Sequence, residues 1–142
     1  MFYWTFEESA TTTASPEAIW ELWSNVDSWS KWDCGVKWAK LETTFSQGEY
    51  ISIKPVNGPK VRCLLEEVTP FKSFTTRNNL PFTTIIFRHQ ISNGVITHKV
   101  EMRGFLTPLF KRLFGKETQR ELPQAIRTLI DMAENNTKTT KE

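Results

Sequence analysis

The last third of the chain reads Gly104-Phe105-Leu106-Thr107-Pro108-Leu109-Phe110-Lys111-Arg112-Leu113-Phe114-Gly115, and later Leu122-Pro123-Gln124-Ala125-Ile126-Arg127-Thr128-Leu129-Ile130-Asp131-Met132-Ala133. Thr107 and Pro108 predict a helix start, because a capping oxygen precedes a ring whose φ is already helical. Apolar residues then recur at helical spacing in both parts. Together they predict one helix about 40 Å long. Pro123 lacks an N–H and should bend this helix, and two helices joined by the polar residues 116–121 are the alternative.

The residues upstream of this helix predict the sheet on which it packs. The first strand begins at Phe2, where apolar and polar residues alternate, and two short helices follow, one from Pro16 and one through Trp29 and Trp32. The remaining predicted strands are residues 36–44, 49–54, 60–68, 71–78, 82–92 and 95–104. Their connections are short, so the sheet should be antiparallel. Strands flanked by helices in this order indicate an α+β fold.

The strongest local signal is the pair Asn93-Gly94, which suits a two-residue type I′ hairpin turn. Such a turn fixes the register of the two strands, so facing residues can be counted back from it. The count places His89 opposite His98, the only two histidines of the chain, on the apolar face. On that face the predicted pairs are Ile91 with Ile96, His89 with His98, Phe87 with Val100, and Ile85 with Met102. On the other face they are Gln90 with Thr97, Arg88 with Lys99, and Ile86 with Glu101.

Three interpretations of the histidine pair are open. Both imidazoles can lie near the rim of the sheet, where water or backbone satisfies them. They can instead line a cavity and bind a ligand or act as acid and base, with a polar partner such as Tyr50, Arg77 or Thr84. A metal site is the third, but two ligands are too few and no Asp, Glu or Cys falls beside them in the register.

Size and composition exclude several classes of protein. The chain has 142 residues, 39 % of them hydrophobic, which suits one domain, expected over residues 1–134 and followed by a disordered tail over 135–142. The net charge of +2 gives no reason to expect a nucleic-acid partner, and no segment is apolar enough for integral membrane association. No signal peptide is evident, so we expect a cytoplasmic protein in which Cys34 and Cys63 are free thiols, and a monomer or weak dimer.

Motifs of known chemistry are missing from the sequence. It holds no nucleophile elbow, phosphate-binding glycine loop, Cys-x-x-Cys pair or dinucleotide fingerprint, so we expect no cofactor and no metal. A group of cations at Lys111, Arg112, Lys116 and Arg120 is interleaved with Glu117 and Glu121, which is typical of a solvated helix face. Six Trp and ten Phe are many for a small domain, and they fill a large core or line a cavity.

Two segments resemble the polyketide cyclase/dehydrase and lipid-transport family of the START-like, or Bet v 1-like, superfamily. One is residues 14–33, Ala-Ser-Pro-Glu-Ala-Ile-Trp-Glu-Leu-Trp-Ser-Asn-Val-Asp-Ser-Trp-Ser-Lys-Trp-Asp, and the other is the pair of stretches quoted above. Phe45-Ser46-Gln47-Gly48 also resembles a turn of that family. The similarity in element order covers nearly the whole chain. It is a specific signal for the fold and a weak one for function.

The resemblance implies a helix-grip fold, in which a seven-stranded antiparallel sheet wraps around the long C-terminal helix and encloses an apolar cavity. Residues expected to line that cavity, with His89 and His98, are Trp32, Trp38, Phe74, Phe87, Val100, Met102, Phe110, Leu113 and Ile126. The implied function is binding of a small hydrophobic or aromatic ligand, lipid- or polyketide-like. The alternatives are a cyclase or dehydratase with His89 or His98 as acid/base, and an interaction module with a filled core.

Overall fold

The computed structural model describes residues 2–141, and the side chains of residues 2–135. Seven strands form one sheet: β1 Phe2–Thr11, β2 Val36–Leu41, β3 Tyr50–Pro55, β4 Val61–Thr69, β5 Ser73–Leu80, β6 Thr83–Ser92 and β7 Val95–Gly104. The helices are α1 Pro16–Ser24, the 3-10 turn η1 Val26–Ser28, α2 Trp29–Trp32 and α3 Thr107–Lys141. The predicted α+β helix-grip architecture is confirmed, and α3 is a single helix with Pro123 inside it.

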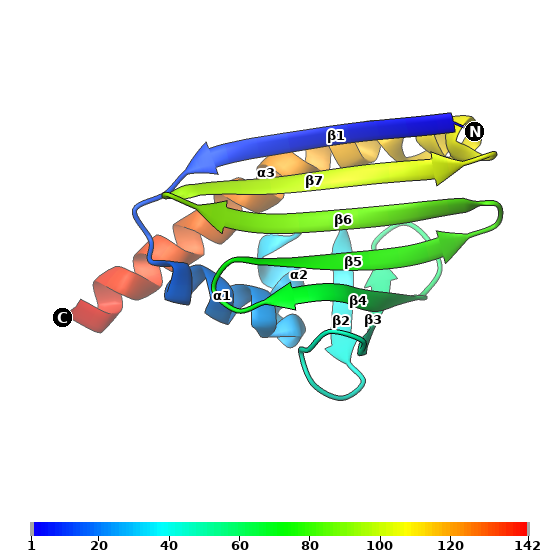
Figure 1. Cartoon of the computed structure of the whole chain (residues 1–142). Helices are drawn as coiled ribbons and strands as arrows, with labels where there is room; N and C mark the ends of the chain where they lie inside the picture. The colour runs from blue at the N-terminus through cyan, green and yellow to red at the C-terminus, as the bar shows by residue number, and fades with distance from the viewer. Residues whose placement is uncertain (1, 142) are drawn as a thin grey trace.

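All neighbouring strands are antiparallel, in the order β1-β7-β6-β5-β4-β3-β2. Figure 1 shows α3 running lengthwise behind β1 and β7, with α1 and α2 beside its C-terminal half. The α1 helix begins as predicted, because the Ser15 side chain accepts a hydrogen bond from the Ala18 N–H and Pro16 follows. The chain therefore closes one face of the sheet with helices from both ends of the sequence.

The predicted hairpin register is confirmed at every counted pair, from Ile91 with Ile96 to Ile85 with Met102. Asn93 and Gly94 have φ angles of 53° and 73°, as a type I′ turn requires. Two residues of the outer face, Ile86 and Glu101, depart from expectation because both are buried. The Glu101 side chain is buried, because Arg88, Lys99 and Arg103 surround it on the outer face at 3.0, 3.5 and 3.0 Å.

The start of α3 also differs in detail from the predicted cap. The Thr107 hydroxyl donates to the Phe2 carbonyl at 3.5 Å, so it ties the helix to the first strand of the sheet. Other bounds shift by a few residues: β2 ends at Leu41, and β5 begins at Ser73 because Phe71 has a φ of 65° within the preceding turn. The expected tail over 135–142 stays a prediction, since the side chains of 136–141 and all of residue 142 lie outside the described residues.

Two separate clusters of buried apolar side chains form the core. The larger lies among α1, α2, the sheet and the C-terminal half of α3, and Trp23, Trp29, Phe74 and Leu129 belong to it. The smaller is built on Ile85, Val100 and Met102, with Phe87 and Phe110 packed against it. Because the core is divided in this way, the sheet and the N-terminal half of α3 are not fully joined by packed side chains.

Candidate functional site: a cavity between the sheet and α3

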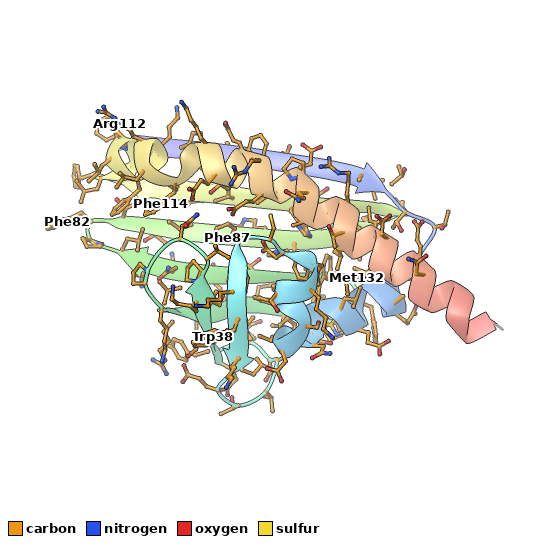
Figure 2. The ribbon with its side chains drawn as sticks, turned by 180° about the vertical axis from the view of Figure 1, so that it is seen from behind. Trp38, Phe82, Phe87, Arg112, Phe114 and Met132 are labelled. Carbon is orange, nitrogen blue, oxygen red and sulfur yellow. The ribbon has the colours of Figure 1, made fainter. Side chains whose placement is uncertain are left out.

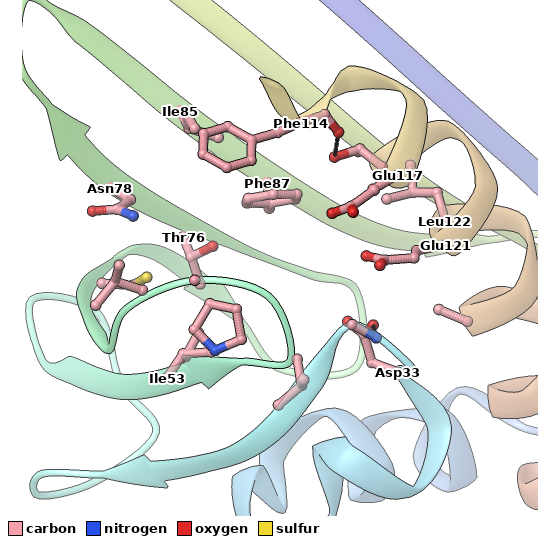
Figure 3. A pocket seen from close by; sticks show the side chains of 18 of the residues that line it. Asp33, Ile53, Thr76, Asn78, Ile85, Phe87, Phe114, Glu117, Glu121 and Leu122 are labelled. Atoms are coloured by element: carbon pink, nitrogen blue, oxygen red, sulfur yellow. Dashed lines mark hydrogen bonds between the residues drawn. The ribbon is translucent and has the colours of Figure 1, made fainter. Parts of the chain in front are cut away.

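A cavity of about 420 Å³ lies between α3, strands β3 to β6 and the α2–β2 connection. Figure 3 shows side chains from these elements pointing toward a common space. The apolar lining residues are Trp29, Trp32, Val36, Ile53, Pro55, Pro59, Val61, Leu80, Ile85, Phe87, Phe110, Phe114, Leu122 and Ala125. The polar ones, with Gly35 and Gly58, are Asp33, Asn57, Cys63, Thr76, Asn78, His89, His98, Glu117, Thr118 and Glu121. The cavity is thus mostly apolar with a few polar groups, as small-molecule sites usually are.

Strand alternation explains which sheet residues reach the cavity. Lining residues on β5 are Thr76, Asn78 and Leu80, and on β6 they are Ile85, Phe87 and His89, every second position in each case. The intervening residues face outward, so Arg77 pairs with Glu66 at 3.2 Å and Thr84 donates to Asn79 at 3.3 Å. Tyr50 is likewise outside the wall, with the Arg62 guanidinium 3.7 Å from its ring centre. None of the three polar partners proposed for the histidines lines the cavity.

The histidine pair forms the deep end of the cavity. The two imidazole ring centres are 4.4 Å apart, and His98 is buried while His89 keeps some exposure where the cavity reaches it. Phe74 stacks on His89 at 4.1 Å between ring centres, and Trp23 and Trp32 surround both rings. Burial lowers the pKa of His98 to about 3. Burial, followed by the nearby His98, holds the pKa of His89 well below its ordinary value, so both rings are neutral at pH 7.

Several polar atoms at this deep end have no hydrogen-bond partner in the described protein. They are His89 Nδ1, His98 Nε2 and Trp32 Nε1, all on residues that line the cavity, and Trp23 Nε1 beside them. A buried polar atom without a partner costs about 1–3 kcal/mol. All four atoms are shielded from solvent by the surrounding rings.

Carboxylates cluster where the α2–β2 connection meets α3. Asp33 accepts a hydrogen bond from the Gly35 N–H at 3.0 Å, and burial raises the pKa of Asp33 to about 6. Burial, then the charges of Asp33 and Glu117, raises the pKa of Glu121. Glu121 Oε2 occupies the space that a Cβ would need at Gly35, so only glycine fits there without displacing it. The two carboxylates lie against the same turn of backbone (Figure 3).

The rim of the cavity is formed by the β3–β4 loop and the exposed side of α3. Asn57 on that loop donates to Glu117 Oε1 at 3.4 Å, which connects the two sides of the opening. Within the described part of the chain, no Lys or Arg lines the cavity, whereas Asp33, Glu117 and Glu121 all do. Over residues 2–135 no group of three or more His, Cys, Asp or Glu side chains is arranged to hold a metal ion.

Five of the eleven residues that the sequence analysis placed in the cavity are on its wall, namely Trp32, Phe87, His89, His98 and Phe110. The structure puts the others elsewhere. Phe74, Val100, Met102 and Ile126 are buried in the core behind the wall, Trp38 is partly exposed with Lys40 near its ring, and Leu113 is 57 % exposed on the outer side of α3. Their part in ligand binding stays a prediction.

Sequence reasoning missed the polar residues of the opening. Asp33, Glu117 and Glu121 are far apart in the chain, and only the packing of the α2–β2 turn on α3 brings them together. The helical stripe was available in principle, because Phe110, Phe114, Glu117, Glu121 and Ala125 recur every three or four residues. The sequence analysis instead named Phe110, Leu113 and Ile126 on this helix, and only Phe110 lines the cavity.

Comparison with known proteins agrees with this architecture. The family model described as polyketide cyclase / dehydrase and lipid transport matches residues 3–135, and the chain belongs to that family. No curated protein matches it in sequence. The solved structures it resembles include major latex-like protein 151 of Panax ginseng, at a TM-score of 0.75 and 10 % identity, covering 94 % of this chain and 99 % of that one.

Two further structures show the same fold at low identity. Norcoclaurine synthase of Thalictrum flavum, solved as a point mutant in complex with a transition-state analogue, has a TM-score of 0.68 and 11 % identity, covering 96 % of this chain and 97 % of that one. A protein of Mesorhizobium loti has a TM-score of 0.67 and 18 % identity, covering 93 % and 98 %. These likenesses show that the chain shares the fold of these proteins. In the described residues, no helix has the length and apolar character needed to cross a membrane.

Proposed function

We propose that this protein binds a small, largely apolar or aromatic molecule in the cavity between the sheet and α3. The observation that carries the proposal is the cavity itself, about 420 Å³ with a mostly apolar wall and unpartnered polar atoms at its deep end. A volume of this size falls within the range of small-molecule sites. An interaction module with a filled core would not need such a space.

The charges of the lining residues narrow the class of ligand. A carboxylate or phosphate entering the cavity would meet Asp33, Glu117 and Glu121 and would find no cationic side chain among the described lining residues. An unpaired charge is costly to bury, and like charges nearby increase that cost. The ligand that fits is therefore neutral or carries an amine, and a free fatty acid or an anionic lipid fits poorly.

The chemistry of the histidine pair favours binding over acid–base catalysis. A general base works best when its pKa is near the operating pH. Burial lowers the pKa of His98 to about 3, so its imidazole is a weak base and is not available as an acid at pH 7. Neutral imidazoles still donate and accept hydrogen bonds, which suits them to hold a hydroxyl or carbonyl of a ligand.

The test is a set of ligands that share one chain and differ only in the head group. Decanol, decylamine and decanoic acid are titrated below their micelle-forming concentrations, and binding is measured by calorimetry and by the rise in Tm. We expect decanol and decylamine to bind and decanoic acid to bind at least tenfold more weakly. Equal or tighter binding of the acid at pH 8 contradicts the charge argument.

A variant that fills the cavity locates the binding. Ala125 lines the cavity on α3, so Ala125→Leu should weaken binding of decanol while leaving the protein folded. Ala18→Leu makes the same change on α1, outside the cavity, and should bind normally. If both variants bind decanol as tightly as the parent, the ligand lies elsewhere and the proposal is wrong.

Binding that survives His89→Gln and His98→Gln supports a carrier, whereas turnover that depends on either imidazole supports an enzyme.

A further inference from the structure

Five large apolar side chains are exposed together at one end of the molecule, and we call them the tip patch. They are Phe2, Phe82, Phe105, Leu109 and Leu113, with exposed fractions of 54, 77, 66, 47 and 57 %. The backbone brings their segments together, since Gly104 pairs with both Phe2 and Thr83. The Phe105 N–H also donates to the Phe82 carbonyl at 2.9 Å. Exposed apolar side chains gathered in this way indicate an interaction surface.

Phe82 is the residue of the tip patch whose position contributes least to the packing of the fold. Its φ is 53°, in the left-handed region that Gly and Asn adopt readily and bulky residues rarely do. It is also 77 % exposed, and among the described residues it makes no ring contact. Phe71 shares the positive φ at the other end of the sheet, but its ring packs near that of Trp20 at 6.1 Å. Phe82 therefore holds a strained position without a packing gain.

The charges at the start of α3 have one sign, and carboxylates enter the helix only from Glu117 onward. The first ten residues of α3, 107–116, contain Lys111, Arg112 and Lys116 and no carboxylate. The positive end of the helix dipole favours acidic residues in this part of a helix, so the sequence runs against local helix stability here. Figure 2 shows Arg112 and Phe82 at the same end of the molecule, where the N-terminus of β1 also lies in Figure 1.

The tip patch adjoins the opening of the cavity. Leu109 and Leu113 are on the outer side of α3, and Phe110 and Phe114 on the adjacent side line the cavity. The rings of Phe110 and Phe114 stack with 6.0 Å between their centres. Phe114 itself is 36 % exposed, so it belongs to both the cavity wall and the surface at this end. A molecule that leaves a surface on which the tip patch rests would next reach the opening of the cavity.

We propose that the tip patch docks the protein on the surface of an anionic lipid bilayer. Aromatic and aliphatic side chains enter the boundary between head groups and acyl chains, while Lys111, Arg112 and Lys116 contact anionic head groups. A bilayer suits this surface because it accepts apolar tips without a matching pocket and attracts cations over a broad area. The anionic lipids are the docking surface and not the cargo, because the cavity wall is acidic.

The test is flotation of the full chain with vesicles of phosphatidylcholine alone or phosphatidylcholine mixed with phosphatidylglycerol. We expect binding to the mixed vesicles, at least tenfold weaker binding to phosphatidylcholine, and loss of binding as salt is raised. Phe82→Asn should reduce vesicle binding several-fold and keep the fold, since Asn tolerates the positive φ. The double variant Lys111→Glu with Arg112→Glu should abolish binding to the mixed vesicles.

Matched controls lie at the opposite end of the sheet. Phe71→Asn makes the same replacement at a second positive-φ phenylalanine, and Lys72→Glu reverses an exposed charge next to it. Both should bind the mixed vesicles like the parent. Equal loss in the control and patch variants overturns the proposal, as does salt-independent binding to phosphatidylcholine alone. The proposal is also overturned if the parent does not bind vesicles but forms dimers that Phe82→Asn dissociates. The patch would then join two copies of the chain.

This inference does not depend on the proposed ligand. Ala125→Leu, which fills the cavity, should still float with the mixed vesicles, and Phe82→Asn should still bind decanol. If the parent binds vesicles but does not bind decanol, the cavity proposal alone is rejected. If the parent binds decanol but does not bind vesicles, the docking proposal alone is rejected.

Discussion

Burial of an imidazole changes what it can do, and His98 is the clearest example. Its surroundings are Trp23, Trp32 and the ring of His89, with no charged partner, so the protonated form has nothing to stabilise it. The sequence predicted that both histidines share the inward face, and the register is right. It could not predict how completely they are buried, because that depends on α1 and α2 covering the end of the sheet.

The first residue-scale prediction concerns acid stability. The pKa of His98 is about 3 in the folded chain and near 6.5 when unfolded, so below pH 6.5 the unfolded state binds the extra proton. Stability should therefore fall as the pH falls from 6.5 toward 3, by up to about tenfold in the unfolding constant per pH unit. Urea unfolding at several pH values measures this, and His98→Gln should flatten the dependence. Ring NMR signals that titrate independently near pH 6.5 would contradict a buried pair.

Asp33 should act in the opposite direction. Its pKa is about 6 in the folded chain and 3.8 unfolded, so the folded state binds the proton more tightly between these values. Stability from this group rises as the pH falls through 6, and its charge costs stability at pH 7.5. Asp33→Asn keeps an acceptor for the Gly35 N–H and should increase the folding constant at pH 7.5, by roughly a hundredfold at most. Asp131→Asn on the exposed side of α3 is the control, and an equal gain there would refute the explanation.

At the scale of elements, the β6–β7 hairpin was the most predictable part of the fold, because local chemistry determines it. Asn93-Gly94 determines its own turn, and the turn determines every pair of β6 and β7. Other strands were harder, because the β4–β5 ladder shifts register between Leu65 and Glu67 and the β2–β3 ladder shifts between Val36 and Trp38. A shift of one residue exchanges the two faces of a strand, so residues of β2 to β5 could not be assigned to the cavity from alternation alone.

The face of α3 was the other difficulty at this scale. Leu113 and Phe114 are adjacent in sequence and about 100° apart around a helix, so a small rotation decides which one enters the cavity. Both helix stripes contain apolar residues, and the sequence has no local signal that separates a cavity from a docking surface. In the structure Phe114 lines the cavity and Leu113 is exposed at the tip patch.

A prediction about β6 and β7 concerns Glu101. Burial alone would raise its pKa, but hydrogen bonds from Arg88 and Arg103 outweigh burial and hold the pKa below its usual value. Glu101→Gln removes the charge that these cations share, and should lower the free energy of unfolding by about 1–2 kcal/mol. This expected loss is modest because the Glu101 carboxylate lies on the outer face of the sheet, where its own cationic neighbours cover it. Urea denaturation measures the change.

The matched control for Glu101 is an exposed pair on the same sheet. Arg62 binds Glu42 through two hydrogen bonds of 2.7 and 3.0 Å, with both side chains open to solvent. Exposed pairs contribute little, so Glu42→Gln should leave stability unchanged. If the two variants lose the same stability, shielding of Glu101 by its neighbours has no energetic consequence.

At the scale of the whole molecule, the net charge of +2 conceals an uneven distribution. The acidic side chains Asp33, Glu117 and Glu121 gather at the cavity, and Lys111, Arg112 and Lys116 gather at the tip. A charge count over the chain averages these regions, and for that reason it gave no indication of either one. The α+β architecture was predictable because it rests on element order, whereas the segregation of charge depends on which elements become neighbours in space.

The pairing of the first strand with the seventh has a consequence for how the chain is made. Phe2 pairs with Gly104 and Thr11 with Val95, so β1 has no partner until residues 95–104 have left the ribosome. During that interval Trp4 and Phe6 remain on an open edge that chaperones can recognise and other nascent chains can join. The yield of this protein in cells should therefore depend on the speed of synthesis and on chaperone supply as well as on final stability.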